Sequence, residues 1–546
     1  MTSRKSISFL MAMLMLTVNS VCTAYYDIVA ESTKNAIDEK KLPTFENAKF
    51  SRFSSPVIGA DATVAFSAIL TGPNIVNNNN ETIWRSRQGS LQLIAREGDP
   101  APGTEQSVSF STLYNRRIIA STNRSLAFSA KLRGPSINTG NNQGIWRVHD
   151  DSLSLVARIG DGTFKAIYDF VYVDSITEGP FIAILGDDVN HRRGIWAGTP
   201  DSLQAIILSG SAAPVAGCKF ATAIGRPTLN HHGQVAFLAP MIPTVSGVLC
   251  ATTLYRVNAA AGSAGLKKIA SQGDPIPGFP VRNNDHDPSR FGAFSLGGGR
   301  AEPKINDQGN VVFGNSVLVA NHTNFVGRGS LWVGEPGLPP KLVIIQNQTL
   351  GGTSSLITGV ASANRYSIGT NGRVAVYTVS DNRPGILAGF ASDNSAFVRL
   401  DEFGSTQLEP IAQQGAVAAE LDPITHNTLG FPVINASGKV AFFSRTNNAN
   451  YGGIWSGFGS DDLKLLAYSD PNRFDETGCE PLRNLRGIVP ITTAGEVSGN
   501  GTSDGLPSQF NDRGQVAFRA RLANPATEAI LVSPTDPGCI GNKFTP

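Results

Sequence analysis

Asn511-Asp512-Arg513-Gly514-Gln515-Val516-Ala517-Phe518 ends in a short apolar strand that occurs eight times along the chain. The other seven copies lie at residues 64–66, 126–128, 182–184, 235–237, 311–313, 374–376 and 440–442. Consecutive apolar residues predict a strand buried on both faces, because a strand with one solvated face would alternate apolar and polar residues. Sheets stacked around an axis bury both faces against their neighbours, so the pattern favours a β-propeller.

Two further repeated parts follow the apolar strand. The second part, usually Ile-Trp, lies at residues 83–84, 145–146, 195–196, 254–255, 331–332, 386–387, 454–455 and 530–531. We expect its tryptophans to be large buried wedges between adjacent sheets. The third part has the pattern Leu-x-x-Ile/Val-Ala, as in Leu91 to Ala95, with looser copies elsewhere.

The count of these parts predicts how the ring closes. The third part is missing after residues 530–531, while Tyr26-Asp27-Ile28-Val29-Ala30 supplies a copy ahead of any first part. Fixed self-similarity indicates a repeat architecture, and the last blade of a propeller is often completed from the opposite terminus. The sequence therefore predicts an all-β propeller of eight four-stranded blades closed by the N-terminal strand. A seven-bladed ring and an open β-solenoid are the alternatives.

Residues 1–24 have the pattern of a signal peptide. Arg4 and Lys5 precede an apolar stretch, and Cys22-Thr23-Ala24 offers small residues for cleavage. We expect residues 25–546 to form a single propeller domain, with no further membrane span, in a secreted, periplasmic or extracellular protein. Lipidation at Cys22 is the alternative, although Asn19-Ser20-Val21 is a poor lipobox.

The charge balance limits the classes of possible partner, and the cysteines indicate the cellular compartment. The chain has 45 Lys and Arg against 43 Asp and Glu, and cleavage after Ala24 would remove two basic residues and no acidic one. This neutrality argues against nucleic acid or an anionic membrane surface as partner. The remaining four cysteines fall two by two within the fourth and eighth repeat units, which predicts the disulfides Cys218–Cys250 and Cys479–Cys539 in an oxidising compartment. Four buried free thiols are the alternative.

The strand order places the variable loops on one face. We name the four strands of a blade A to D, with Val-Ala-Phe as B. Short Asn-x-x-Gly turns join A to B, and short polar turns join C to D. The longer B–C and D–A loops open on the other face, where we expect a glycan or protein ligand near the central funnel.

Acidic residues on that face are the candidate site residues. Asp99, Asp161 and Asp274 lie in Gly-Asp turns after strand D, where they either shape the turn or form a ring of carboxylates for a cation or a sugar hydroxyl. Asp285 and Asp287, in Asn283-Asn284-Asp285-His286-Asp287, are the candidate calcium ligands, although the spacing is not that of an EF-hand. No other cofactor is expected. No catalytic motif of known type is present, so no catalytic residue is assigned.

The phrase Asn-x-x-Gly-x-Val-Ala-Phe, at Asn230, Asn435 and Asn511, resembles the secreted bacterial proteins known as NxxGxxxAF tandem-repeat proteins. The resemblance covers nearly the whole chain after residue 24. It implies an exported bacterial β-repeat protein of uncharacterised activity, and it brings no catalytic residues. Many members carry a C-terminal surface anchor, and residues 541–546 show no such motif.

Two functions follow from these observations. The first is a non-catalytic binding or scaffold protein of the bacterial envelope or exterior. The second is a carbohydrate-active hydrolase or lyase, because paired carboxylates in a propeller funnel can serve as acid and base. Two carboxylates about 5–10 Å apart, one with a raised pKa, would favour the enzyme.

Overall fold

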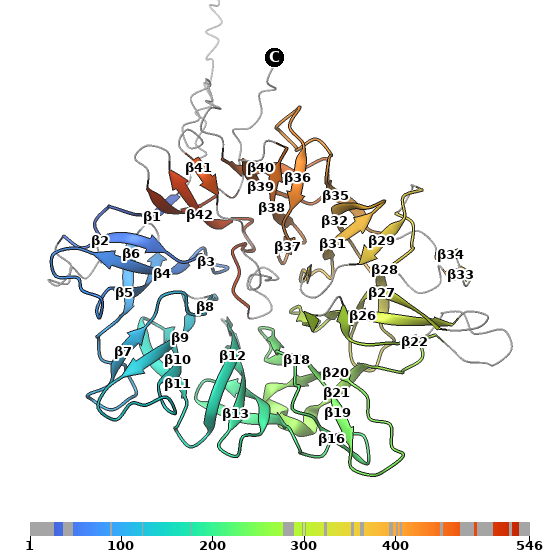
Figure 1. Cartoon of the computed structure of the whole chain (residues 1–546), viewed down its shortest axis with the longest axis horizontal. Helices are drawn as coiled ribbons and strands as arrows, with labels where there is room; N and C mark the ends of the chain where they lie inside the picture. The colour runs from blue at the N-terminus through green and yellow to red at the C-terminus, as the bar shows by residue number, and fades with distance from the viewer. Residues whose placement is uncertain are drawn as a thin grey trace, which may run out of the picture.

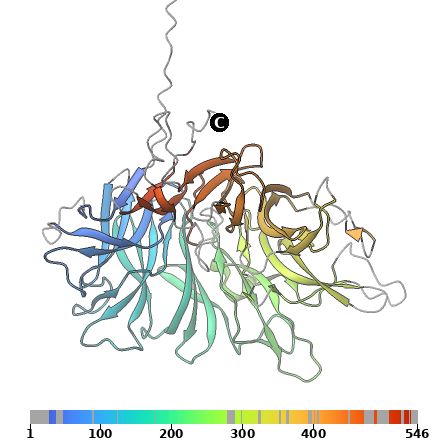
Figure 2. The ribbon, with the colours of Figure 1, turned by 45° about the horizontal axis from the view of Figure 1, so that its top comes forward.

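The computed structural model describes residues 27–535, apart from residues 37–46, 88–89, 123, 176, 277–288, 297–298, 301, 321–324, 351–353, 361–364, 392–396, 400–401, 404–406, 448–450, 470–484, 489–505, 523–526 and 534. Within the described chain, eight antiparallel sheets stand around a common axis as a β-propeller (Figures 1 and 2). The predicted fold class and blade number are confirmed.

The first four blades contain strands β2 to β21. Blade 1 holds β2 (Lys49–Phe53), β3 (Val57–Ile58), β4 (Val64–Thr71), β5 (Glu81–Arg87) and β6 (Ser90–Arg96). Blade 2 holds β7 (Ser109–Thr112), β8 (Ile118–Ala120), β9 (Leu126–Arg133), β10 (Gln143–His149) and β11 (Ser152–Arg158). Blade 3 holds β12 (Phe164–Ser175), β13 (Gly179–Asp188), β14 (Arg193–Thr199) and β15 (Ser202–Leu208). Blade 4 holds β17 (Thr228–Leu229), β18 (Gln234–Ala239), β20 (Thr253–Asn258) and β21 (Lys267–Ser271), with the 3-10 helix η2 (Ala259–Gly265) and a side hairpin of β16 (Cys218–Phe220) and β19 (Met241–Pro243).

The last four blades complete the ring. Blade 5 holds β22 (Arg290–Phe291), β25 (Lys304–Ile305), β26 (Val311–Ala320), β27 (Phe325–Gly334) and β28 (Lys341–Ile345), with a hairpin of β23 (Ser295–Leu296) and β24 (Gly299–Arg300). Blade 6 holds β29 (Ile357–Val360), β30 (Tyr366–Ile368), β31 (Val374–Ser380), β32 (Arg383–Gly389) and β35 (Glu409–Gln413), with β33 (Phe397–Arg399) and β34 (Glu402–Phe403) beside it. Blade 7 holds β36 (His426–Leu429), β37 (Val433–Ile434), β38 (Val440–Thr446), β39 (Gly452–Gly457) and β40 (Lys464–Tyr468). Blade 8 holds β41 (Leu485–Ile488), β42 (Ala517–Leu522), β43 (Glu528–Val532) and β1 (Asp27–Glu31).

The N-terminal strand closes the ring as predicted. β1 pairs antiparallel with β43, and Ile28 lies opposite Leu531. Blade 8 is thus built from both ends of the chain (Figure 1). A propeller left without this strand would expose a sheet edge and the apolar flank of a blade.

Strand A is split in most blades. In blade 2, for example, strand A consists of β7 and β8, which both pair with β9. β8 forms the tight hairpin with strand B, while β7 pairs with its far end. Each blade therefore keeps four strand positions.

The Val-Ala-Phe strands bury both faces as predicted. In blade 1, Phe66 and Trp84 pack against Ala517 and Ile530 of blade 8, whereas Ala65 packs in the core shared with blade 2. The tryptophans at 84, 146, 196, 332 and 455 are all buried, so the predicted wedges between sheets are confirmed. Each contacts an aromatic ring from strand A of its own blade, as Trp146 does with Phe110 at 5.0 Å between ring centroids.

In four A–B turns the repeated asparagine joins its blade to the next. In the A–B turn of blade 5, Asn306 Oδ1 accepts from Asn310 N at 2.9 Å, and its Nδ2 donates to Gly369 O of blade 6 at 2.9 Å. Asn230, Asn435 and Asn511 use the two ends of the carboxamide in the same way. An aspartate could close the turn but could not donate to the neighbour, which explains why the repeat uses asparagine.

Two turns carry glycine where the repeat has asparagine. A Cβ atom on Gly59 would lie 2.2 Å from Ser121 O, and one on Gly369 would lie 2.6 Å from Asn435 O. The backbones of adjacent blades approach so closely there that only glycine fits.

Candidate functional site

The three predicted carboxylates lie in separate blades, each within its own turn. Asp161 Oδ1 accepts from Thr163 N at 2.8 Å, and Asp274 Oδ2 accepts from Ser271 N at 2.9 Å. Burial raises the pKa of Asp99, outweighing the attraction of Arg96. Within the described part of the chain, no hydrogen bond or ion pair joins any two of the three carboxylates. Asp161 and Asp274 thus shape their own turns, and Asp274 also pairs with Lys268 Nζ at 3.1 Å. A ligand for the three carboxylates remains a prediction.

The predicted calcium site lies outside the described residues, since Asp285 and Asp287 fall within 277–288. Among the residues that the structure describes, no three His, Cys, Asp or Glu side chains are placed to hold a metal ion. Calcium binding therefore remains a prediction.

One of the two predicted disulfides is confirmed. Cys218 and Cys250 are bonded, with their Cα atoms 5.8 Å apart, and they tie β16 to the segment before β20. Cys479 and Cys539 lie outside the described residues.

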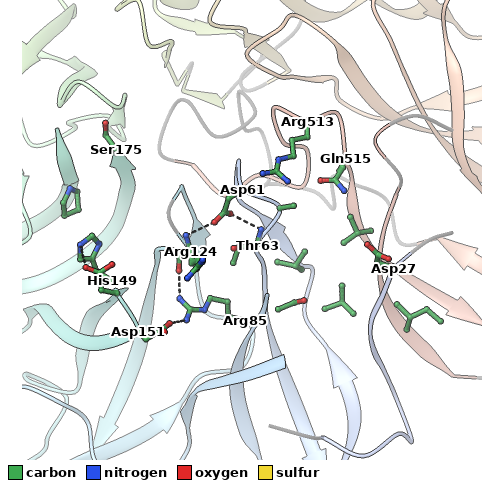
Figure 3. Close-up of a pocket in the computed structure, with 18 of the residues that line it drawn as sticks. Asp27, Asp61, Thr63, Arg85, Arg124, His149, Asp151, Ser175, Arg513 and Gln515 are labelled. Atoms are coloured by element: carbon green, nitrogen blue, oxygen red, sulfur yellow. Dashed lines mark hydrogen bonds and ion pairs between the residues drawn. The ribbon is translucent and has the colours of Figure 1, made fainter. Parts of the chain in front are cut away.

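A groove of about 1160 Å³ opens on the face that carries the A–B and C–D turns (Figure 3). It crosses blades 8, 1, 2 and 3, and its lining includes Asp27 of β1. This is the face opposite the one on which the B–C and D–A loops led us to expect a site. The central funnel itself contains residues 506–516, which precede β42, and Leu506 packs on the core shared by blades 3 and 4 (Figure 1).

Arg85 lies at the base of the groove. It follows Trp84 in β5, so its side chain points to the opposite side of the sheet, toward blade 2. The side chain is fully buried, and its guanidinium donates to Arg124 O, to Gln92 Oε1 and to Asp151 in the C–D turn of blade 2. Its Nε is buried and has no hydrogen-bond partner among the described residues. A buried charge held by several acceptors gives this part of the groove a fixed geometry.

Asp61 fixes the wall next to Arg85. Its Oδ1 accepts from Thr63 N at 3.0 Å and its Oδ2 accepts from Arg124 N at 2.8 Å, so it joins the A–B turns of blades 1 and 2 (Figure 3). The exposed side chains of Arg124 and Arg513 form no hydrogen bond or ion pair within the described chain. Both line the groove. They are therefore free to bind a ligand.

His149 marks the end of the groove over blades 2 and 3. Its Nδ1 lies 3.0 Å from Asp174 Oδ2, and its Nε2 lies 3.4 Å from Asp150 Oδ2. Asp174 is fully buried, and within the part of the chain that the structure describes its Oδ1 has no hydrogen-bond partner. The imidazole thus lies between two carboxylates.

The two histidines of the blade 4 turn link blades together. His231 Nδ1 lies 2.9 Å from Asp307 Oδ1, and His232 Nδ1 lies 2.7 Å from Glu178 Oε1. Burial lowers the pKa of His231, but Asp307 outweighs it, so the pKa lies above its ordinary value. Burial raises the pKa of Asp307, but the hydrogen bond and charge of His231 outweigh burial, so this pKa lies below its ordinary value. Both pKa shifts favour the charged forms of His231 and Asp307, and therefore the ion pair between blades 4 and 5.

Sequence reasoning did not identify Arg85, Arg124 or Asp61. The sequence did contain one signal for Arg85. An arginine follows Ile-Trp at both 83–85 and 145–147, and a charged residue is not expected in a strand that is buried on both faces. Arg147 repeats the arrangement, with its Nη2 2.9 Å from Asp201 in the C–D turn of blade 3. Asp61 and Arg124 occupy variable turn positions that gave no signal.

The fold and the groove define an eight-bladed β-propeller with a polar site on its turn face. The chain belongs to a family of unknown function, DUF7453, whose model matches residues 29–179, 161–324 and 299–472. The described residues contain no helix long and apolar enough to cross a membrane. No curated protein matches the chain.

Several solved structures are similar to the chain. They include the β-propeller domain of the Trilobed protease from Pyrococcus furiosus (11% identity, 78% of this chain, 98% of that chain, TM-score 0.38). An oligogalacturonate lyase in complex with manganese matches at 7% identity (89% of this chain, 97% of that chain, TM-score 0.31). The Aleuria aurantia lectin matches at 12% identity (67% of this chain, 99% of that chain, TM-score 0.24). At these values the matches give no argument about function.

Proposed function

We propose that the protein is an exported, non-catalytic binding protein that holds an extended saccharide in the groove over blades 8, 1, 2 and 3. The observation that carries the proposal is the groove itself, about 1160 Å³ in volume and lined mainly by polar residues. Pockets for small ligands usually have volumes of about 300–1000 Å³, so this one suits a longer ligand.

The lining suits a ligand with many hydroxyl groups. Arg124 and Arg513 offer donors, Asp27 offers acceptors, and Gln515 offers both. A saccharide needs donors and acceptors side by side, because each hydroxyl both donates and accepts a hydrogen bond. The carboxylate of Asp61 is already held by two backbone N–H groups, which favours a positioning role over proton transfer.

Export is supported by two observations. The first 24 residues have the pattern of a signal peptide. The disulfide Cys218–Cys250 suits an oxidising compartment. We therefore place the protein in the bacterial envelope or outside the cell.

Screening residues 25–546 on a glycan array, with and without calcium, tests the function. We expect binding that is lost in an Arg124→Ala, Gln515→Ala variant and kept in Lys267→Ala, an exposed residue of blade 4 outside the groove. Binding that the groove variant leaves unchanged would contradict this site. Failure to bind any glycan would contradict the function.

A second candidate function is a carbohydrate hydrolase or lyase. It is favoured by the two carboxylates of Glu81 and Glu97, which lie on the face of the B–C and D–A loops. Burial raises the pKa of Glu97, and nearby Glu81 raises it further, although Arg133 opposes the change. Glu97 Oε2 is buried and has no hydrogen-bond partner in the described chain, while Glu81 Oε2 accepts from Leu113 N at 2.7 Å. Glycan cleavage that is lost in Glu97→Gln at unchanged stability would support this enzyme over a binding protein.

A further inference from the structure

The middle of the groove is lined by arginines from three blades. Arg85 of blade 1 forms the buried base, while Arg124 of blade 2 and Arg513 of blade 8 come from A–B turns (Figure 3). Their positions follow from ring closure, because residue 513 lies far from residues 85 and 124 in the sequence. Three guanidinium groups around one groove create a local positive potential.

The acidic residues of the lining compensate this charge only in part. Asp151 pairs with Arg85, and both oxygens of Asp61 accept backbone N–H groups. Asp150 lies beside His149. Asp27 comes from β1, on the blade 8 side of the groove, apart from the three arginines (Figure 3). Hydrogen bonds from N–H groups leave the Asp61 carboxylate charged, so the middle of the groove holds three arginines against Asp61 and Asp151. Within the described chain the side chains of Arg124 and Arg513 form no ion pair.

A second observation indicates a preformed site. Arg85 is fully buried, yet its Nε has no hydrogen-bond partner among the residues that the structure describes, although both terminal nitrogens are held by blades 1 and 2. A buried donor without a partner is costly, and such groups are uncommon away from functional sites. Its side chain lines the groove in which Arg124 and Arg513 are free.

We propose that the ligand is an acidic oligosaccharide whose carboxylate or sulfate groups bind Arg124 and Arg513 above Arg85. Guanidinium groups bind such oxyanions through two parallel hydrogen bonds, which gives both strength and orientation. Asp27 and Gln515 then accept hydrogen bonds from sugar hydroxyls beyond the charged middle. This inference rests on the proposed saccharide-binding function and specifies its ligand class.

The test is calorimetric titration of residues 25–546 with three oligosaccharides of equal length, one neutral, one composed of uronic acids and one sulfated. We expect the uronate or the sulfated oligomer to bind at least about tenfold more tightly than the neutral one, and its affinity to fall as salt is added. Arg124→Gln combined with Arg513→Gln should remove this preference. Arg124→Lys combined with Arg513→Lys keeps the charges and should retain salt-sensitive binding, and Lys267→Gln should bind like the unchanged protein.

The outcomes separate the two proposals. If the neutral oligosaccharide binds as tightly as the acidic ones, or if the glutamine variant keeps the preference, the acidic-ligand inference is wrong and the saccharide-binding function stands. If none of the three binds, the proposed function itself is contradicted. Thermal melting of each variant shows whether a loss of binding reflects a loss of fold.

Discussion

Asn511 Nδ2 donates a hydrogen bond to Gly59 O at 3.3 Å, which joins residues 452 positions apart in the sequence. It is the same bond that Asn306 makes to Gly369 between neighbouring blades 5 and 6. Blade 8 therefore contacts blade 1 as an ordinary neighbour. The turns that make this contact, together with β1, also line the groove, so ring closure and the proposed binding site have a common origin.

Replacing Asn306 with Asp should lower the free energy of unfolding by about 1–3 kcal/mol. The carboxylate can still close its own turn but cannot donate to Gly369 O, and it places a negative charge beside that carbonyl oxygen. Denaturant unfolding measures the change. Asn190→Asp, at an exposed position in blade 3, is the control and should be nearly neutral. Equal stability of the two variants would show that the repeat asparagine does not hold the blades together.

Replacing Trp146 with Ala should lower the free energy of unfolding by about 3–5 kcal/mol, as for other large core truncations. The indole is fully buried between blades 1 and 2, and its Nε1 donates to Pro102 O at 3.0 Å. Phe458→Ala, at a side chain that is 44% exposed, is the matched aromatic control. A cost for Trp146→Ala no larger than that of the control would contradict the wedge role.

Stability should fall as the pH drops below about 6.5, in part because of His426. His426 lies in strand A of blade 7, at the position equivalent to Phe110 in blade 2. The centroid of its ring lies 4.9 Å from that of Trp455. Burial lowers the pKa of His426 from 6.5 to about 4. The unfolded chain therefore binds a proton between pH 6.5 and 4 that the folded chain does not, which costs on the order of 3 kcal/mol across that range.

Unfolding measured from pH 7.5 to 4 checks this prediction. His426→Phe should flatten the pH dependence, since phenylalanine fits the position in other blades and does not titrate. The same pH dependence in the variant would show that other groups cause it.

Most of the fold could be predicted from the sequence, whereas the groove could not. The consecutive apolar residues of Val516-Ala517-Phe518 and its copies predict strands that are buried on both faces. The count of repeat parts predicts that residues 26–30 belong to blade 8. The groove depends on residues such as Asp61 and Arg124, at turn positions that the repeat leaves variable. They become neighbours only through contacts between blades, which no local pattern encodes.

Deleting residues 25–33 should lower the melting temperature and promote aggregation, because it removes β1 and exposes β43 as a sheet edge. The same deletion removes Asp27 to Val29 from the groove and should weaken ligand binding. Scanning calorimetry and light scattering measure the first effect. A truncated protein that melts like residues 25–546 would contradict a structural role for this strand.

The most direct test of the central claim, that the N-terminal strand closes an eight-bladed ring, is the double substitution Ile28→Cys and Leu531→Cys. These residues lie opposite one another in the β1–β43 ladder, where Cα atoms are about 5 Å apart, within the range for a disulfide. Mild oxidation followed by peptide mapping should show a disulfide between positions 28 and 531 in high yield. The control pair Ile28→Cys and Ala520→Cys, with the second position on β42 beyond β43, should not cross-link. Free thiols at 28 and 531, or equal cross-linking of the control, would contradict the closed ring.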